Sequence, residues 1–206
     1  MDKDIWYYAL GFTAQALFSA RLLIQWILTE KAKKVISPTI FWQLSLLAAI
    51  LLSVYGWLRK DFAIILGQFF SYYIYIWNLD TKQNWKTIAR PMRYVILSLP
   101  VLALGYVIYR GESSIDWLFE SISTELLLFG SAGQIIFTFR FIYQWWYSRK
   151  REESLLPAGF WIISLTGSSI IVLYGIIRKD PVLILGQSVG FIAYIRNLYF
   201  AIKNKE

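Results

Sequence analysis

The sequence predicts an all-α integral membrane protein with seven transmembrane helices, arranged as two parallel three-helix bundles with one linker helix between them. Three observations support this fold class. Hydrophobic residues make up 57% of the chain and charged residues only 17%, whereas soluble domains hold about 45–50% and about 25%. Seven apolar segments come close to the roughly 20 residues that a helix needs to cross a bilayer. Much of the first half of the chain also recurs in the second half.

The apolar segments define the expected spans to within a few residues. They are 5–28, 39–58, 62–79, 92–109, 124–147, 159–177 and 182–202. Asp2 and Asp4 precede the first segment, which contains polar residues and no small-residue cleavage site. We therefore expect this segment to be a span and not a cleaved signal peptide.

Prolines stand at informative positions of four expected spans. Pro38, Pro157 and Pro181 each lie at the start of a span, where the missing N–H costs no hydrogen bond. Pro100 lies inside the fourth span, and we expect a kink there because proline removes a helical hydrogen bond.

The distribution of basic residues predicts the orientation of the chain. With the N-terminus outside, twelve Lys and Arg residues fall on the inner side and six on the outer side. Since cytoplasmic loops are enriched in basic residues, the count predicts an outer N-terminus and a cytoplasmic C-terminus. We also expect residues 114–122 to lie along the outer interface as a short amphipathic turn.

An internal repeat is the strongest feature of the sequence. Shifting residues 11–79 by 119 positions, without a gap, makes roughly a third of the positions identical, as expected of a duplicated structural unit. The pairs include Gly11 and Gly130, Gln15 and Gln134, Arg21 and Arg140, Gln25 and Gln144, Pro38 and Pro157, Trp42 and Trp161, Tyr55 and Tyr174, Asp61 and Asp180, Gln68 and Gln187, Tyr75 and Tyr194, and Asn78 and Asn197.

The number of spans predicts how the two units are related. A three-span unit alone would leave its second copy inverted, and the unmatched fourth span restores its direction, so the units run parallel about an axis along the membrane normal. We expect residues 1–80 to form the first three-helix repeat, 81–122 the linker with the fourth helix, and 123–206 the second repeat. The duplication alone is compatible with a plain scaffold or with a transporter whose site lies on the axis.

The repeat also carries a family resemblance. The run from Gln15 to Trp26, then Pro38 with Phe41 and Trp42, then residues 59–79, resembles the lipid-A-disaccharide synthase N-terminal domain family. The second copy continues the match but has Arg196 in place of Trp77. The family is similar to the PQ-loop and SWEET transporters, whose three-plus-one-plus-three arrangement is the one expected here. The resemblance implies a membrane module in lipid A biosynthesis, located in the bacterial inner membrane, without a glycosyltransferase domain of its own.

Composition excludes several kinds of chemistry. The chain has no Cys and no His, so thiolate catalysis, His general base catalysis and Cys or His metal sites are ruled out. No nucleophile or phosphate-loop motif is present. We therefore expect no catalytic residues, no metal and no cofactor, and we expect that the chain is not an enzyme. The net charge is +8, and most of the basic residues lie between the apolar spans. This placement points to anionic lipid, not to nucleic acid, as the partner.

Paired polar residues inside the expected spans are the candidate binding residues. A buried Arg costs a few kcal/mol in a membrane and should face protein or water. Arg21 shares a helical stripe with Gln15, Phe18 and Gln25, and the same pattern recurs around Arg140. The third span of each repeat carries a second polar face. The substrate-binding candidates are Arg21, Arg140, Gln15, Gln134, Gln25, Gln144, Gln68, Gln187, Asn78, Asn197, Tyr75 and Tyr194.

Each set has a plainer interpretation. The arginines could extend to the inner interface or pair with a carboxylate such as Glu30, and the amides could be hydrogen-bonding contacts between packed helices. The outer turns supply secondary candidates, which could meet a phosphate or could simply anchor the turns with the Asp as a helix cap. These are Arg59, Lys60, Asp61, Arg178, Lys179 and Asp180.

These features favour a transporter or flippase for a lipid-linked (polyprenyl-phosphate) sugar or related anionic glycolipid, since planar guanidiniums suit phosphate. A non-catalytic membrane partner of a glycosyltransferase and a SWEET-like small-sugar facilitator are the alternatives. The expected partners are membrane lipid, the glycolipid substrate and a glycosyltransferase.

Overall fold

The computed structural model describes residues 2–110 and 123–203, and within them it contains seven α-helices and one short 3₁₀ helix. The helices are α1 (Asp2–Ala32), α2 (Thr39–Leu58), α3 (Phe62–Thr81), η1 (Trp85–Thr87), α4 (Arg90–Arg110), α6 (Thr124–Arg149), α7 (Ala158–Ile177) and α8 (Pro181–Lys203). Each expected span corresponds to one α-helix, within a few residues at each end. The amphipathic turn expected at 114–122 lies outside the described residues.

Four of the described helices, α2, α6, α7 and α8, are long and apolar enough to cross a membrane. The other three carry more polar or charged residues along their length; α1, for example, contains Arg21, Gln25 and Glu30. The all-helical class is therefore confirmed. Spanning by all seven helices, and the orientation of the chain, stay predictions.

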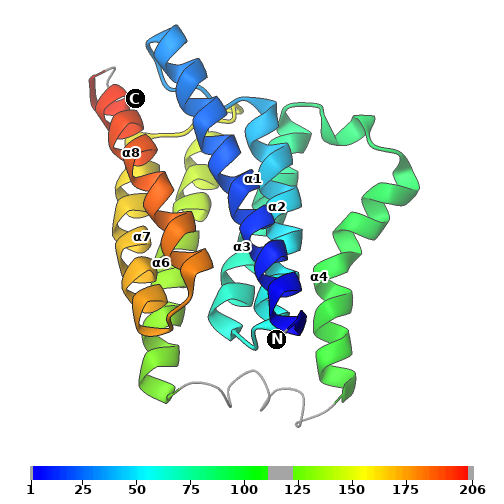
Figure 1. The fold of residues 1–206 in the computed structure, drawn as a ribbon. Coiled ribbons are helices and arrows are strands. Elements are labelled where there is room, and N and C mark those ends of the chain that lie inside the picture. The colour runs from blue at the N-terminus through cyan, green and yellow to red at the C-terminus, as the bar shows by residue number, and fades with distance from the viewer. Residues whose placement is uncertain (1, 111–122, 204–206) are drawn as a thin grey trace.

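Six helices form a ring, because each of them packs on two neighbours, and each repeat contributes three consecutive members. Within the repeats, α2 packs on α1 and α3, and α7 packs on α6 and α8; between them, α3 packs on α6 and α1 on α8. We call these two contacts between repeats the α3–α6 seam and the α1–α8 seam. The termini lie at opposite ends of the ring (Figure 1), which we call its N-terminal and C-terminal ends.

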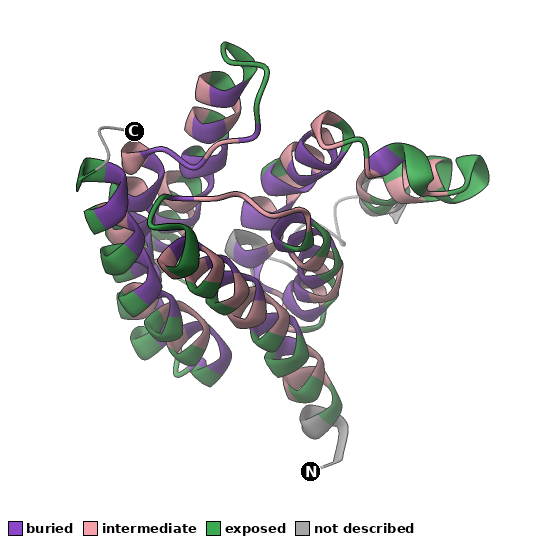
Figure 2. Ribbon diagram, turned by 90° about the horizontal axis from the view of Figure 1, so that it is seen from above, coloured by how far each residue is buried: buried purple, intermediate pink, exposed green. Residues whose placement is uncertain are grey.

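Helix α4 lies at the side of the ring and is largely exposed (Figure 2). It continues through Pro100 as one helix, and its contacts to α3 include hydrogen bonds from the hydroxyls of Tyr72 and Tyr73 to the carbonyls of Ile96 and Leu97. The linker helix thus takes no part in the seams.

The buried faces of the ring helices turn toward one another (Figure 2) and form two apolar clusters. The larger cluster includes the fully buried Trp42 and Trp161, so these two paired residues are core aromatics. The smaller cluster contains Tyr55 and Tyr174 near the N-terminal end. Polar residues are buried between and beyond the clusters, and they define the candidate site.

Candidate binding chamber between the repeats

A small polar chamber lies between the two repeats, walled by α1, α3, α6 and α8 with Leu52 of α2. Its volume is about 30 Å³, which holds one or two water molecules. Eight of the twelve sequence-predicted binding residues line it, as four repeat-related pairs: Gln15 and Gln134, Arg21 and Arg140, Gln68 and Gln187, and Tyr75 and Tyr194. The structure therefore brings most of the candidates together in one place.

The two arginines dominate the chamber. Arg21 is 3% exposed and Arg140 is 2% exposed. Both guanidinium carbons lie near the ring of Phe141, at 5.7 Å and 4.5 Å from its centre. Both groups line the same chamber, so they face one shared space. Their geometry agrees with the sequence-based expectation, whereas their role in binding stays a prediction.

Aromatic faces compensate part of the cost of burying these charges. The guanidinium carbon of Arg140 lies 3.3 Å from the ring centre of Phe137, and that of Arg21 lies 4.5 Å from the equivalent Phe18. Such cation–π contacts contribute about 0.5–2 kcal/mol each, most when desolvated. Arg21 also donates a hydrogen bond to the Ser45 hydroxyl. The sequence interpretation had placed Phe18 on the Arg21 stripe but had not identified Ser45 as a contact.

The chamber carries positive charge without a balancing carboxylate. Among the described residues that line it, none is acidic. Within the described part of the chain, Nε of Arg21, and Nε and Nη1 of Arg140, have no hydrogen-bond partner. Glu30, considered from the sequence as a partner for Arg21, instead contacts Arg196. Two planar groups with free donors in a desolvated space are suited to an anion such as phosphate, which accepts paired hydrogen bonds.

The four remaining binding candidates close the C-terminal end of the chamber. Gln25 donates to the Asn197 side chain at 2.8 Å across the α1–α8 seam. Gln144 and Asn78 exchange hydrogen bonds of 3.0 Å and 3.2 Å across the α3–α6 seam. These fully buried amides therefore hold the repeats together, as the plainer interpretation of the amide pattern proposed.

The loops at this end add contacts that the sequence did not indicate. Ser154 donates to Asn78 at 2.8 Å and receives a hydrogen bond from Trp42 Nε1 at 3.1 Å. Ser37 and Ser154 lie 2.9 Å apart, oxygen to oxygen. Serines in short loops are common, and only the fold shows that these two meet across the repeats.

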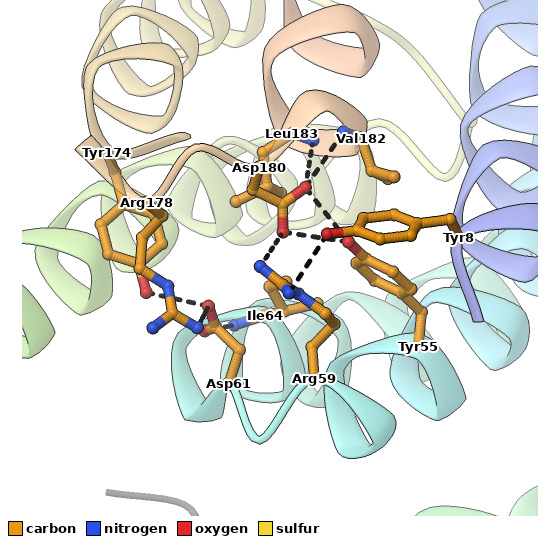
Figure 3. Close-up of polar contacts among 10 residues, drawn as sticks. All are labelled: Tyr8, Tyr55, Arg59, Asp61, Ile64, Tyr174, Arg178, Asp180, Val182 and Leu183. Carbon is orange, nitrogen blue, oxygen red and sulfur yellow. Dashed lines mark hydrogen bonds and ion pairs between the residues drawn. The ribbon is translucent and has the colours of Figure 1, made fainter. Parts of the chain in front are cut away.

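The N-terminal end is closed by reciprocal contacts between the turns at 59–61 and 178–180 (Figure 3). We keep for them the name outer turns, from their predicted side of the membrane. Asp180 accepts hydrogen bonds from the Tyr55 hydroxyl at 3.0 Å and 3.1 Å and pairs with Arg59 at 3.5 Å. In the same way, Asp61 accepts from the Tyr174 hydroxyl at 2.9 Å and pairs with Arg178 at 3.4 Å. Each carboxylate thus binds residues of the other repeat.

The same aspartates begin the third helix of each repeat, as the plainer interpretation of the turns proposed. Asp61 accepts from the backbone N–H of Ile64, and Asp180 from those of Val182 and Leu183. Both carboxylates are fully buried, and burial raises the pKa of Asp61 above its ordinary value. The neighbouring Lys60 and Lys179 adopt left-handed backbone angles, with φ of 53° and 51°, and form the tight turns themselves.

Tyr55 and Tyr174 are residues of the outer closure that the sequence interpretation did not single out. A signal was present: the two tyrosines are repeat-related, and each lies one helical turn before the Arg of the outer turn. Spacing alone could not show that their hydroxyls reach the opposite repeat, because the partner belongs to a distant part of the chain.

Glycines allow the seams to close around long amide side chains. A Cβ on Gly186 would lie 2.1 Å from Gln15 Oε1, and one on Gly67 would lie 2.5 Å from Gln134 Oε1. Thr138 also donates to the Gly67 carbonyl at 3.2 Å. Close backbone approach at small residues is a common device between membrane helices, and here it leaves room for chamber amides.

The duplicated pattern matches a known family. The model of the Lipid A Biosynthesis N-terminal domain matches residues 10–80 and again residues 129–199, which together make up more than half of the 206 residues. The chain belongs to this family. The two matches are offset by the same 119 positions found from the sequence, so both the resemblance and the repeat are confirmed.

Proteins named lipid-A-disaccharide synthase are similar to nearly the whole chain. Lipid-A-disaccharide synthase of Chlamydia muridarum is 29% identical over 210 residues, which is 96% of this chain and 34% of that protein. The protein of the same name from Chlamydia pneumoniae is 30% identical over 202 residues, or 93% of this chain and 33% of that protein. This chain therefore spans about a third of the length of these relatives. No solved structure matches it.

These relatives correct one expectation from the sequence. The chain was expected not to be an enzyme, because it lacks Cys, His and recognisable catalytic motifs. Its relatives, however, are named as a synthase, which is an enzyme. The absence of familiar catalytic motifs was insufficient evidence against an enzyme, since those motifs represent only a few known chemistries. The chain also spans only part of the length of these relatives.

Proposed function

We propose that this chain is a membrane protein of lipid A biosynthesis whose chamber binds the phosphate-bearing headgroup of an anionic glycolipid and carries it between leaflets. The buried pair Arg21 and Arg140 is the observation that carries the proposal. Both guanidiniums face a chamber lined by no described acidic residue, and three of their nitrogens have no described partner. Burying such charges costs several kcal/mol unless a counter-ion binds.

The two closed ends support a carrier cycle. The N-terminal end is held by two reciprocal Asp–Arg–Tyr contacts, and the C-terminal end by two amide pairs. Both closures join one repeat to the other, and both are polar. A rotation of one repeat against the other could open one end while the other stays closed, as in transporters with parallel repeats.

The size of the chamber implies that binding and movement are linked. Because the chamber has a volume of only about 30 Å³, enough for one or two waters, a phosphate and its sugar fit only when the walls move apart. The chamber is also ill suited to a neutral sugar, since a neutral ligand would leave both guanidiniums without a counter-charge. These points favour the anionic glycolipid over the small-sugar facilitator.

Reconstituted vesicles test the proposal. A fluorescent polyprenyl-phosphate sugar is placed in both leaflets, and its movement is followed by quenching from outside. We expect wild-type protein to accelerate the exchange and the double variant Arg21→Gln, Arg140→Gln to lose this effect. Arg196→Gln is the matched control, because this arginine lies outside the chamber and is partly exposed. Equal exchange rates for the double variant and wild type would contradict the proposal, and acceleration of free glucose uptake would favour the facilitator.

A second candidate follows from the name of the relatives, lipid-A-disaccharide synthase. In this case the chamber would hold a phosphate-bearing sugar lipid while one of its hydroxyls attacks the anomeric carbon of a nucleotide-activated sugar, so that the glycosidic bond forms as the nucleotide leaves. Incubating the purified chain with a phosphate-bearing sugar lipid as acceptor and a nucleotide-activated acylated sugar as donor, and measuring the disaccharide and the released nucleotide, tests this candidate. Product formation that depends on Arg21 and Arg140 would support it over the carrier cycle.

A further inference from the structure

The two seams between the repeats are built alike near the chamber. They differ on the side that faces away from the axis of the ring, which we call the outer side of a seam. Both seams contain a glycine beside a chamber glutamine, at Gly67 and at Gly186. On the outer side of the α3–α6 seam lies an aromatic groove of about 450 Å³, which we call the seam groove. Its walls are formed by Phe69, Phe70, Tyr73, Ile74, Trp77, Ile142 and Trp145.

The repeat supplies an internal comparison for this groove. At the positions equivalent to Phe69, Phe70, Tyr73 and Trp77, the α1–α8 seam has Ser188, Val189, Ile192 and Arg196. There Arg196 pairs with Glu30, which also accepts a hydrogen bond from Trp26 at 3.0 Å. At the same level of the α3–α6 seam, Trp77 and Trp145 meet edge to face at 6.3 Å. One seam is therefore closed on its outer side by charges, and the other presents aromatic surface.

The seam groove and the chamber lie on the two sides of the same pair of helices. On α3, Gln68 lines the chamber and the next residue, Phe69, lines the groove. On α6, Phe141 lines the chamber and Ile142 lines the groove. A molecule with an anionic head and an apolar chain could therefore place its head beside the guanidiniums and its chain in the groove by passing between α3 and α6.

We propose that the α3–α6 seam is the lateral entrance for the lipid, and that the seam groove binds the hydrocarbon chain whose phosphate lies in the chamber. This inference rests on the proposed function and extends it: the ligand is a lipid phosphate, not a water-soluble sugar phosphate. Hydrocarbon is the suitable occupant because the groove walls carry no charged side chain, and apolar surfaces within a membrane associate through van der Waals packing. The α1–α8 seam, with its ion pair, takes no chain.

The absence of Cys from the sequence allows a clean test with single cysteines. Phe70→Cys places a thiol on the seam groove, and Val189→Cys places one at the equivalent position of the other seam. The native side chains are 48% and 47% exposed, so the two sites are matched in accessibility. The full chain, in phosphatidylcholine nanodiscs, is incubated with a polyprenyl phosphate that carries a thiol-reactive group on its hydrocarbon chain. Crosslinking to the cysteine is then measured at each of the two positions.

We expect several-fold more crosslinking at position 70 than at position 189, and we expect Arg21→Gln, Arg140→Gln to abolish the difference. Equal crosslinking at the two positions, or a difference that survives loss of both arginines, would overturn the proposal, since ordinary surrounding lipid explains either result. Binding of a short-chain polyprenyl phosphate is measured in parallel. If binding needs the arginines while crosslinking is equal, the lateral entrance alone is wrong. If binding does not need them, the proposed function is wrong as well.

Discussion

Replacing Arg140 by methionine should stabilise the protein while removing its ability to bind an anion. Arg140 is 2% exposed, its Nε and Nη1 have no described partner, and no described acidic residue lines its chamber. A charged residue at the centre of a membrane helix costs about 2.5–3.5 kcal/mol on insertion scales. Its two nearest cation–π contacts, to Phe137 and Phe141, together return about 1–2 kcal/mol. Methionine has a similar length and no charge, so we expect a net gain on the order of 1–2 kcal/mol.

Thermal unfolding in detergent micelles measures this gain. For a chain of this size, about 1 kcal/mol moves the midpoint by about 2–4 °C, so the midpoint should rise by several degrees. Added short-chain polyprenyl phosphate should stabilise the wild type, because a ligand that binds only the folded state shifts the equilibrium by mass action. It should have no effect on Arg140→Met.

The control is Arg196→Met. This arginine is partly exposed and pairs with Glu30, so its loss should cost no more than about 1 kcal/mol. The reasoning is refuted if Arg140→Met lowers the midpoint by as much as a large-to-small core substitution, because the arginine would then be a structural element whose contacts are already satisfied.

Three further predictions concern the seams and the two closures. Gly186→Ala should destabilise by about 1–3 kcal/mol through overpacking against a chamber amide, whereas Gly105→Ala, with nothing within 4 Å of its added Cβ, should be neutral or stabilising; equal unfolding midpoints would contradict this. Asn78→Ala should cost about 1–2 kcal/mol and speed thiol labelling of a Ser71→Cys probe in the chamber, and unchanged labelling would show that this amide does not close it. Burial raises the pKa of Asp61, so the closed form holds a proton on the Asp61 carboxyl more tightly than an open form with that carboxyl in water. Lowering the pH should therefore favour the closed form and slow labelling of the Ser71→Cys probe relative to a surface thiol. Faster labelling at lower pH would contradict this prediction.

The sequence predicted the helices well because each is a long apolar run bounded by turn residues. The start of α2 at Thr39 and the end of α7 at Ile177 were expected at the same positions from the prolines and the charged turns. The repeat was equally accessible, since Arg21 and Arg140 stand at the same place in two copies of one pattern. Two identical stripes on equivalent helices are expected to face equivalent surroundings. In the structure both stripes face the chamber.

The roles of the amides could not be separated from the sequence. Gln68, Tyr75 and Asn78 share a helical face, yet the first two line the chamber while Asn78 bonds Gln144. Helical spacing gives the direction of a side chain but not what stands opposite it at each level. The amide contact depends on how α3 and α6 are aligned along their length, which tertiary packing determines.

The reciprocal closure at the outer turns was missed for a related reason. Within one repeat, Arg59 and Asp61 are close in sequence and invite a local interpretation. In the structure, Asp61 pairs with Arg178 and Arg59 with Asp180. Two identical turns can exchange partners only when the repeats face each other, so the pattern within one copy contains no information about the exchange.

Direct binding of a polyprenyl phosphate to the protein in nanodiscs tests the central claim, that Arg21 and Arg140 together hold a phosphate. Charge-assisted hydrogen bonds contribute about 1.5–3 kcal/mol each, so replacing both arginines by glutamine should weaken binding by about 100-fold or more, while Arg196→Gln should leave the affinity unchanged. An affinity of the double variant within about twofold of the wild type would contradict the account.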